Sequence, residues 1–211
     1  MKGYFHNLVR LSGTLILLMF LTVSTRSQAN ISTAAEKREA EKAWEALIRA
    51  KGGREKLYSV TNMVTQFGDV TRFQLFPCSR WEFGRWLDMR LFLEVYDDEK
   101  KLRVVAGANG PERVYSKDLV EDCWYDQIPF LLETKWRKPT PLRVTREKAG
   151  KNQMDVIETM NGKWQVDFVY EPEDMLVTEV RFLFEDGTPY QKYRFSDYVD
   201  INGIKMPSTF N

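Results

Sequence analysis

The fold is decided by residues 154–209, MDVIETMNGKWQVDFVYEPEDMLVTEVRFLFEDGTPYQKYRFSDYVDINGIKMPST. Apolar and polar residues alternate along most of this stretch, which is typical of β-strands that bury one face. The clearest run is Trp164–Tyr170, where aromatic and aliphatic residues occupy every second position. The same alternation predicts three further strands, at Met154–Met160, Leu176–Phe184 and Tyr190–Tyr198.

Residues that favour tight turns separate these runs. They are Asn161-Gly162, Glu171-Pro172-Glu173-Asp174, Asp186-Gly187 and Asn202-Gly203. An Asn-Gly or Asp-Gly pair supplies the positive φ angles that a two-residue hairpin turn needs. Because such short connections join antiparallel neighbours, the stretch predicts a meander with one aromatic-rich apolar face and one charged face.

A helix is predicted before the strands. Thr33 and Glu36 have the spacing of a capping box, and Gly52-Gly53 would end the helix. Its apolar residues fall on one face: Ala40, Ala43, Trp44, Leu47 and Ile48. The polar face mixes acidic and basic residues, so packing on the sheet is favoured over binding to a membrane surface.

The middle of the chain predicts more strands and a helical insert. Strand patterns occur at Ser59–Phe67, Val70–Phe76, Arg80–Trp86, Met89–Tyr96, Leu102–Ala106, Arg113–Tyr115 and Leu142–Thr145. Between the last two, Asp118–Trp136 has helical spacing, and we interpret it as two short helices with a break at Pro129. This order predicts an α+β domain with helices gathered against one face of a large antiparallel sheet.

The first 29 residues have the layout of a secretory signal peptide. Lys2 and Arg10 precede the short apolar run Thr14–Val23, and Ser27-Gln28-Ala29 offers a cleavage site after Ala29. The run is shorter than the roughly 20 residues that span a bilayer. Alternatively, this stretch is a membrane anchor that is not cleaved, or it is a segment of the protein core that only resembles a signal peptide. We therefore expect an exported protein, with residues 1–29 as the signal and 30–211 as a single domain.

Composition excludes several classes of function. The 31 basic and 30 acidic residues give a near-neutral chain, whereas nucleic-acid binding needs a concentrated basic surface.

Cys78 and Cys123 either form one disulfide, as exported chains allow, or remain two buried thiols.

The sequence predicts no catalytic residues, no metal ligands and no cofactor. The one histidine, His6, lies in the signal region, so imidazole-based catalysis and histidine-containing zinc sites are excluded from the rest. Carboxylates are abundant, but their positions predict solvated charges. Examples are Asp155, Asp167, Glu179 and Asp197, which lie opposite the apolar strand positions.

The aromatic face of the predicted sheet has two interpretations. Its side chains fill a core, or they line an apolar cavity left between sheet and helices. The candidate cavity residues are Trp164, Val166, Phe168, Val180, Phe182, Phe184, Tyr193 and Phe195.

Three segments resemble the outer-membrane lipoprotein-sorting (LolA/LolB-like) superfamily. The first is the signal peptide and helix ending in Ala50-Lys51-Gly52-Gly53, followed by a strand over Tyr58–Phe67. The second is the strand-turn-strand FVYEPEDML at 168–176, and the third is SDYVDINGIKMP at 196–207. All three are turn and strand features, and no ligand-contact residue of the family is matched.

The resemblance implies an unclosed antiparallel β-barrel over a hydrophobic cavity, with helices as a lid. It implies a periplasmic, non-enzymatic protein that binds a lipid or lipoprotein acyl chain and touches membranes only transiently. The helical insert supplies the lid candidates Leu119, Trp124, Ile128 and Leu131. The alternative is an envelope protein-interaction module with a filled core and no ligand.

Overall fold

The computed structural model describes residues 32–211 apart from short gaps at 77–78, 84, 87–89, 92, 98–101, 108–109, 116–126, 151, 163 and 185, and gives only the backbone of the strands within 79–115. Residues 34–211 form one compact unit. The expected signal peptide lies outside the described residues. Among the helices of the described part, none combines the length and apolar character that crossing a bilayer requires.

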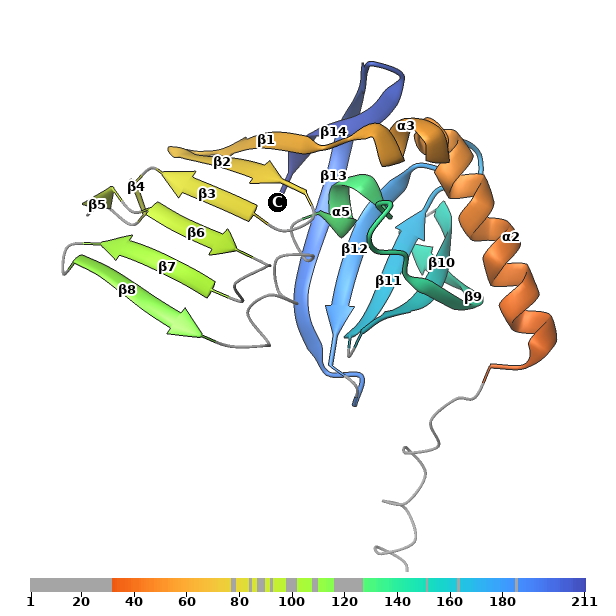
Figure 1. Ribbon diagram of the computed structural model, residues 1–211. Helices are drawn as coiled ribbons and strands as arrows, with labels where there is room; N and C mark the ends of the chain where they lie inside the picture. The colour runs from red at the N-terminus through yellow and green to blue at the C-terminus, as the bar shows by residue number, and fades with distance from the viewer. Residues whose placement is uncertain are drawn as a thin grey trace, which may run out of the picture. The chain divides into compact units, whose positions relative to one another are not determined.

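The predicted N-terminal helix is α2, Ala34–Lys51 (Figure 1). As predicted, it buries Ala40, Trp44, Leu47 and Ile48. The helix contacts three strands from the second half of the chain, β9 (Thr140–Ala149), β10 (Asn152–Asn161) and β14 (Ile204–Phe210). The helix ends in a Schellman motif, in which Gly52 N–H donates to Arg49 O (3.2 Å) and Gly53 N–H donates to Ile48 O (2.8 Å). The two glycines therefore end the helix for the reason that the sequence indicated.

Gly52 also lies against the last hairpin of the chain. A Cβ atom at Gly52 would come within 2.3 Å of Gly203 O, and the φ of Gly52 is +134°. We expect Gly52→Ala to destabilise the protein by about 1–3 kcal/mol or more, because the cost of an alanine at a positive φ and the cost of the clash with Gly203 O add to each other. Gly53→Ala is the matched control, since Gly53 also has a positive φ but no atom within 4 Å of its Cβ position. Urea unfolding of both variants measures the difference, and equal losses would contradict the clash.

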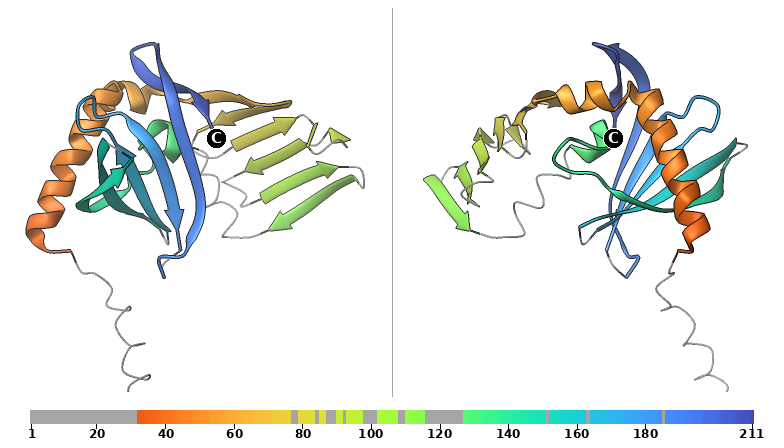
Figure 2. Two further views of the ribbon diagram at one scale, coloured as in Figure 1. Left: turned by 180° about the vertical axis from the view of Figure 1, so that it is seen from behind. Right: turned by 45° about the vertical axis from the view of Figure 1, so that its right-hand side comes forward.

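The second half of the chain forms a six-stranded antiparallel sheet in the order β14-β13-β12-β11-β10-β9 (Figure 2). Its strands are β9 Thr140–Ala149, β10 Asn152–Asn161, β11 Trp164–Tyr170, β12 Val177–Leu183, β13 Pro189–Ile201 and β14 Ile204–Phe210. The four predicted strands of the meander are thus confirmed. At the β13–β14 turn, Asn202 (φ 55°) and Gly203 (φ 79°) have the conformation of a type I′ turn.

The first half forms another antiparallel sheet, in the order β1-β2-β3-β6-β7-β8. Its strands are β1 Asn62–Phe67, β2 Val70–Leu75, β3 Ser79–Phe83, β6 Leu93–Asp97, β7 Leu102–Gly107 and β8 Gly110–Tyr115. Two short strands, β4 Arg85–Trp86 and β5 Arg90–Leu91, pair with each other in a separate sheet. The described strands build open sheets, which confirms the predicted α+β class with an open, curved antiparallel sheet.

One local prediction was wrong. Arg54–Ser59 forms the short helix α3, so the strand expected from Tyr58 or Ser59 begins only at Asn62. Of the two helices expected around Pro129, the second is α5, Ile128–Leu131, with Pro129 in its first turn, and most of the first lies outside the described residues. Proline is tolerated there because the first N–H groups of a helix have no partner inside the helix.

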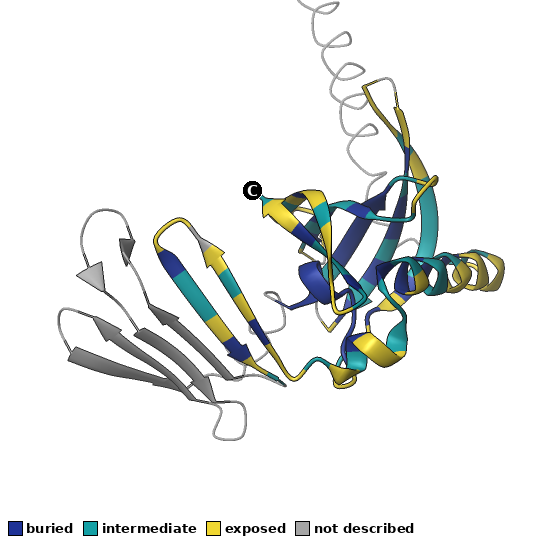
Figure 3. Ribbon diagram, turned by 90° about the horizontal axis from the view of Figure 1, so that it is seen from above, coloured by how far each residue is buried: buried dark blue, intermediate teal, exposed yellow. Residues whose placement is uncertain are grey.

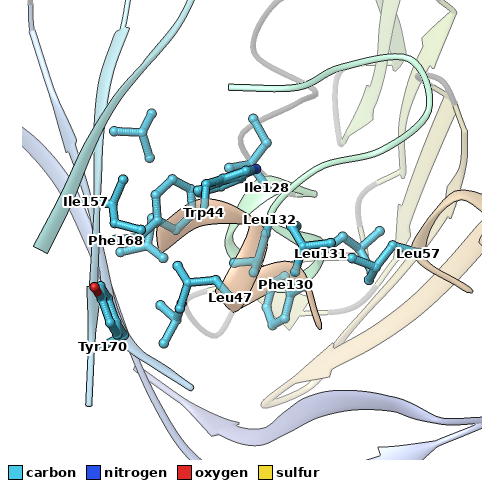
Figure 4. Packing of buried hydrophobic residues seen from close by; sticks show 14 of the residues in the cluster. Trp44, Leu47, Leu57, Ile128, Phe130, Leu131, Leu132, Ile157, Phe168 and Tyr170 are labelled. Atoms are coloured by element: carbon cyan, nitrogen blue, oxygen red, sulfur yellow. The ribbon is translucent and has the colours of Figure 1, made fainter. Parts of the chain in front are cut away.

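One core joins the helices to the second sheet (Figure 3). Trp44 and Leu47 of α2 meet Ile157 and Phe168 of the sheet, and α5 adds further buried side chains (Figure 4). Trp44 and Phe168 pack edge to face, with ring centroids 4.9 Å apart. A smaller cluster of Met154, Val156 and Val169 lies on the other parity of β10 and β11.

Candidate functional site

The structure brings most of the candidate cavity residues together under α2 and α5. Six of them are buried in the main core: Trp164, Val166, Phe168, Val180, Phe182 and Phe195. Tyr193 is half-buried and packs against this core, whereas Phe184 is 41% exposed. That these residues line a ligand cavity stays a prediction.

Two lid candidates lie in α5. Ile128 and Leu131 are buried, and Phe130 between them packs its ring 5.5 Å from that of Phe195 and 5.2 Å from that of Phe210. The other two, Leu119 and Trp124, lie outside the described residues, as do Cys78 and Cys123. The described part of the insert therefore rests directly on β13 and β14.

A half-open groove of about 440 Å³ lies between the α3–β1 segment and the β13–β14 hairpin. This volume falls in the range of about 300–1,000 Å³ that is usual for small-molecule sites. The groove is lined by Lys56, Ser59, Val60, Thr61, Asn62, Met63, Val64, Leu131, Ile201, Asn202, Ile204 and Met206.

The groove has an apolar floor, and its more exposed lining includes both apolar and polar side chains. Met63, Leu131 and Ile204 are each at least nine-tenths buried, whereas Val64 and Ile201 are 57% and 52% exposed. Lys56 carries the one ionised side chain among the lining residues, and its Nζ lies 3.5 Å from Gly203 O. Sequence reasoning missed this groove because its lining comes from three segments that are far apart in the chain.

Glu133 connects three elements of the structure through its carboxylate. Its fully buried carboxylate accepts hydrogen bonds from Trp44 Nε1 (2.7 Å), Arg54 Nε (2.5 Å) and Tyr58 OH (3.0 Å). Arg54 also donates to both carboxylate oxygens of Glu45, at 2.9 and 2.7 Å. The hydrogen bonds to Glu45 and Glu133 raise the pKa of Arg54. The arrangement joins α2 and α3 to the segment after α5.

Lys51 is a second buried ionisable residue, at the last position of α2. It is 3% exposed, and its Nζ lies 5.1 Å from the centre of the Tyr198 ring. Burial lowers its pKa from 10.5 to about 7. Cation–π contact with tyrosine offsets only part of the cost of removing the ammonium group from water.

The charged face of the second sheet corrects one prediction. Asp167 is 9% exposed rather than solvated, and burial raises its pKa to about 6. It pairs in register with Glu158, whose carboxylate lies 2.8 Å from Arg143, and it accepts a hydrogen bond from Gln165 (3.0 Å). Asp197, by contrast, is exposed as predicted. Asp167 also pairs in register with Arg181 of β12, and the charges of Arg181 and Arg143 act on its carboxyl, which pattern alone could not indicate.

The described residues contain no group of three or more histidine, cysteine or carboxylate side chains that could hold a metal ion. They include no histidine, and the pKa values of Asp167 (raised to about 6) and Lys51 (lowered to about 7) are the ones that burial brings near neutral pH. The described residues of the candidate site can therefore hold a ligand through apolar burial and hydrogen bonds.

Comparison with known proteins gives distant structural likenesses. No protein-family model matches the chain. No curated protein matches it either. Among solved structures, a DUF1329 family protein from Desulfovibrio piger is similar with a TM-score of 0.47 and 9% identity, covering 81% of this chain and 84% of that one. An outer membrane lipoprotein-sorting protein domain from Vibrio parahaemolyticus is similar with a TM-score of 0.43 and 10% identity, with the same coverage. Neither likeness assigns a function to this chain.

Proposed function

We propose that the chain is an exported, non-enzymatic protein that binds a lipid or a lipoprotein acyl chain and acts in the sorting of outer-membrane lipoproteins. The observation that carries this proposal is the groove, whose floor of Met63, Leu131 and Ile204 is apolar and continuous with the core. Burial of a hydrocarbon chain there would contribute about 0.8 kcal/mol per methylene group.

The groove suggests how a longer chain would be accommodated. Leu131 belongs both to the groove and to α5, which covers the aromatic face of β13 and β14. A hydrocarbon chain that outgrows the groove would have to displace α5 and reach the candidate cavity residues beneath it. In this proposal Ile128 and Leu131 act as a lid, and residues such as Phe182 and Phe195 receive the end of the chain.

Ile201→Glu tests the groove without touching the core. Ile201 is 52% exposed, so a charge there leaves folding intact but places a carboxylate where the hydrocarbon would lie. We expect the dissociation constant for cis-parinaric acid, a fluorescent fatty acid, to rise about tenfold or more, which corresponds to about 1.4 kcal/mol. Fluorescence titration of the purified protein gives this constant.

Tyr190→Glu is the matched control, because Tyr190 lies on the same strand, is 54% exposed and is not among the groove residues. It should leave the dissociation constant unchanged. Uptake by neither wild type nor control, in samples that unfold cooperatively, would refute lipid binding. Phe168 and Phe182 are unsuitable for such a test because both are fully buried, and a charge there would unfold the protein.

The alternative function is an envelope protein-interaction module. The dense contact between Trp44 and Phe168 favours it, since this part of the aromatic face is filled by α2. Native mass spectrometry of the exported protein separates the two functions. A co-purified lipid supports the acyl-chain proposal, and a lipid-free protein with a defined protein partner supports the module.

A further inference from the structure

The terminal strands of the two six-stranded sheets differ in how their free edges are protected. These strands are β1, β8, β9 and β14. Three of them contain a proline and charged residues: Pro111 in β8, Pro141 in β9 and Pro207 in β14. Proline and charge are the usual means by which an edge strand is kept from pairing with another chain. β1, with the sequence NMVTQF, contains neither.

The hydrogen-bond pattern identifies the backbone groups on the free edge of β1. Phe76 N–H donates to Thr61 O (2.9 Å), and β1 and β2 pair in register without a bulge. Bonded pairs alternate along an antiparallel ladder, so Met63 and Thr65 bond to β2. The N–H and C=O groups of Asn62, Val64 and Gln66 therefore point away from β2, where β1 has no further strand partner among the described strands.

This edge borders the groove. Asn62, Met63 and Val64 all line it, and across the groove stand Ile201 and Asn202 at the tip of the β13–β14 hairpin. Met63 points inward and is 8% exposed, whereas Val64 is 57% exposed. A strand added beside β1 would thus direct every second side chain toward the apolar floor and the others toward solvent.

We propose that the free edge of β1 binds an extended polypeptide segment of a partner protein by strand addition. The segment has apolar residues at alternate positions, which enter the groove beside Met63, Leu131 and Ile204. Lys56 at the rim favours a neutral or acidic segment over a basic one. The groove of about 440 Å³ beside β1 is bounded by the β13–β14 hairpin, which favours a single extended chain over a second folded copy. This inference concerns a peptide partner and goes beyond the proposed lipid binding.

The test uses labelled heptapeptides with valine, leucine or phenylalanine at alternate positions, serine between them, and glutamate or lysine at one end. Fluorescence anisotropy with the full chain measures their binding. We expect binding of the acidic peptides, with Val64→Pro weakening it at least about tenfold because proline removes the N–H of the edge. Val64→Ala keeps that N–H and should change the dissociation constant much less. Circular dichroism checks that both variants are folded.

N-methylated peptides test the same bonds on the unaltered protein. In strand addition the N–H groups of one alternate set of residues face β1, and those of the other set face away. Methylation of one set should abolish binding, whereas methylation of the other should be tolerated. For antiparallel addition the sensitive set is the serines, and for parallel addition it is the apolar residues.

Three outcomes would overturn the proposal. The first is no binding of any peptide by a sample that takes up cis-parinaric acid, a result that leaves lipid binding intact. The second is equal sensitivity of the two methylated sets, which would indicate apolar contact without strand addition. The third is a wild-type dimer in sedimentation velocity that Val64→Pro converts to a monomer, which would show that the edge binds a second copy of this chain.

Discussion

Glu133→Ala is expected to lower the free energy of unfolding by about 3–5 kcal/mol, as is usual when one partner of a buried ion pair is removed. The substitution leaves Trp44 Nε1, Arg54 Nε and Tyr58 OH without their shared acceptor. Trp44 is fully buried, so its N–H cannot recover the bond from solvent. Urea unfolding followed by circular dichroism measures the loss.

Glu133→Gln separates charge from hydrogen bonding. The amide keeps an oxygen acceptor and the shape of the side chain, so we expect a smaller loss than for alanine. Glu45→Gln is the surface control, since Glu45 is half-buried and binds the same Arg54. It should cost no more than about 1 kcal/mol, as exposed ion pairs do. A loss for Glu133→Ala as small as that for Glu45→Gln would contradict the structural role of Glu133.

Lys51→Met is expected to stabilise the protein by about 1–4 kcal/mol at pH 6, within the range seen when buried charges are replaced by apolar side chains. The gain should depend on pH. Because the pKa of Lys51 falls to about 7 in the folded state, the unfolded chain binds more protons between pH 7 and pH 10.5. Wild-type stability therefore rises with pH across this window.

The advantage of Lys51→Met should accordingly be largest below pH 7 and shrink toward pH 10. Unfolding free energies of wild type and variant at pH 6, 8 and 10 provide the measurement. Lys42→Met is the control, because Lys42 is exposed on the same helix and should change stability little at any pH. A constant difference between wild type and Lys51→Met from pH 6 to pH 10 would show that Lys51 keeps its ordinary pKa.

Local patterns were sufficient where one short segment decides the structure. The alternation in Trp164–Tyr170 predicted β11 with its correct bounds, and the apolar stripe of α2 predicted which residues it buries. Asn202-Gly203 predicted a tight turn because only a few residue types adopt two successive positive φ angles. In each case the deciding interaction lies within a few residues of sequence.

Sequence patterns failed where distant segments decide the environment. Asp167 occupies a polar strand position, yet neighbouring strands bury it. Glu133 lies within the segment that was expected to be a helical insert, and its donors Trp44 and Tyr58 are 89 and 75 residues away in sequence. The groove has the same origin, since α3, α5 and the β13–β14 hairpin build it jointly.

The close approach of Gly52 to Gly203 has a consequence for the order in which the molecule assembles. A ribosome adds Gly203 to the chain 151 residues after Gly52. The entropy lost in closing such a long loop must be offset by contacts that form simultaneously. In a nascent chain the end of α2 can therefore dock only after the β13–β14 hairpin has emerged, which postpones commitment to the native state.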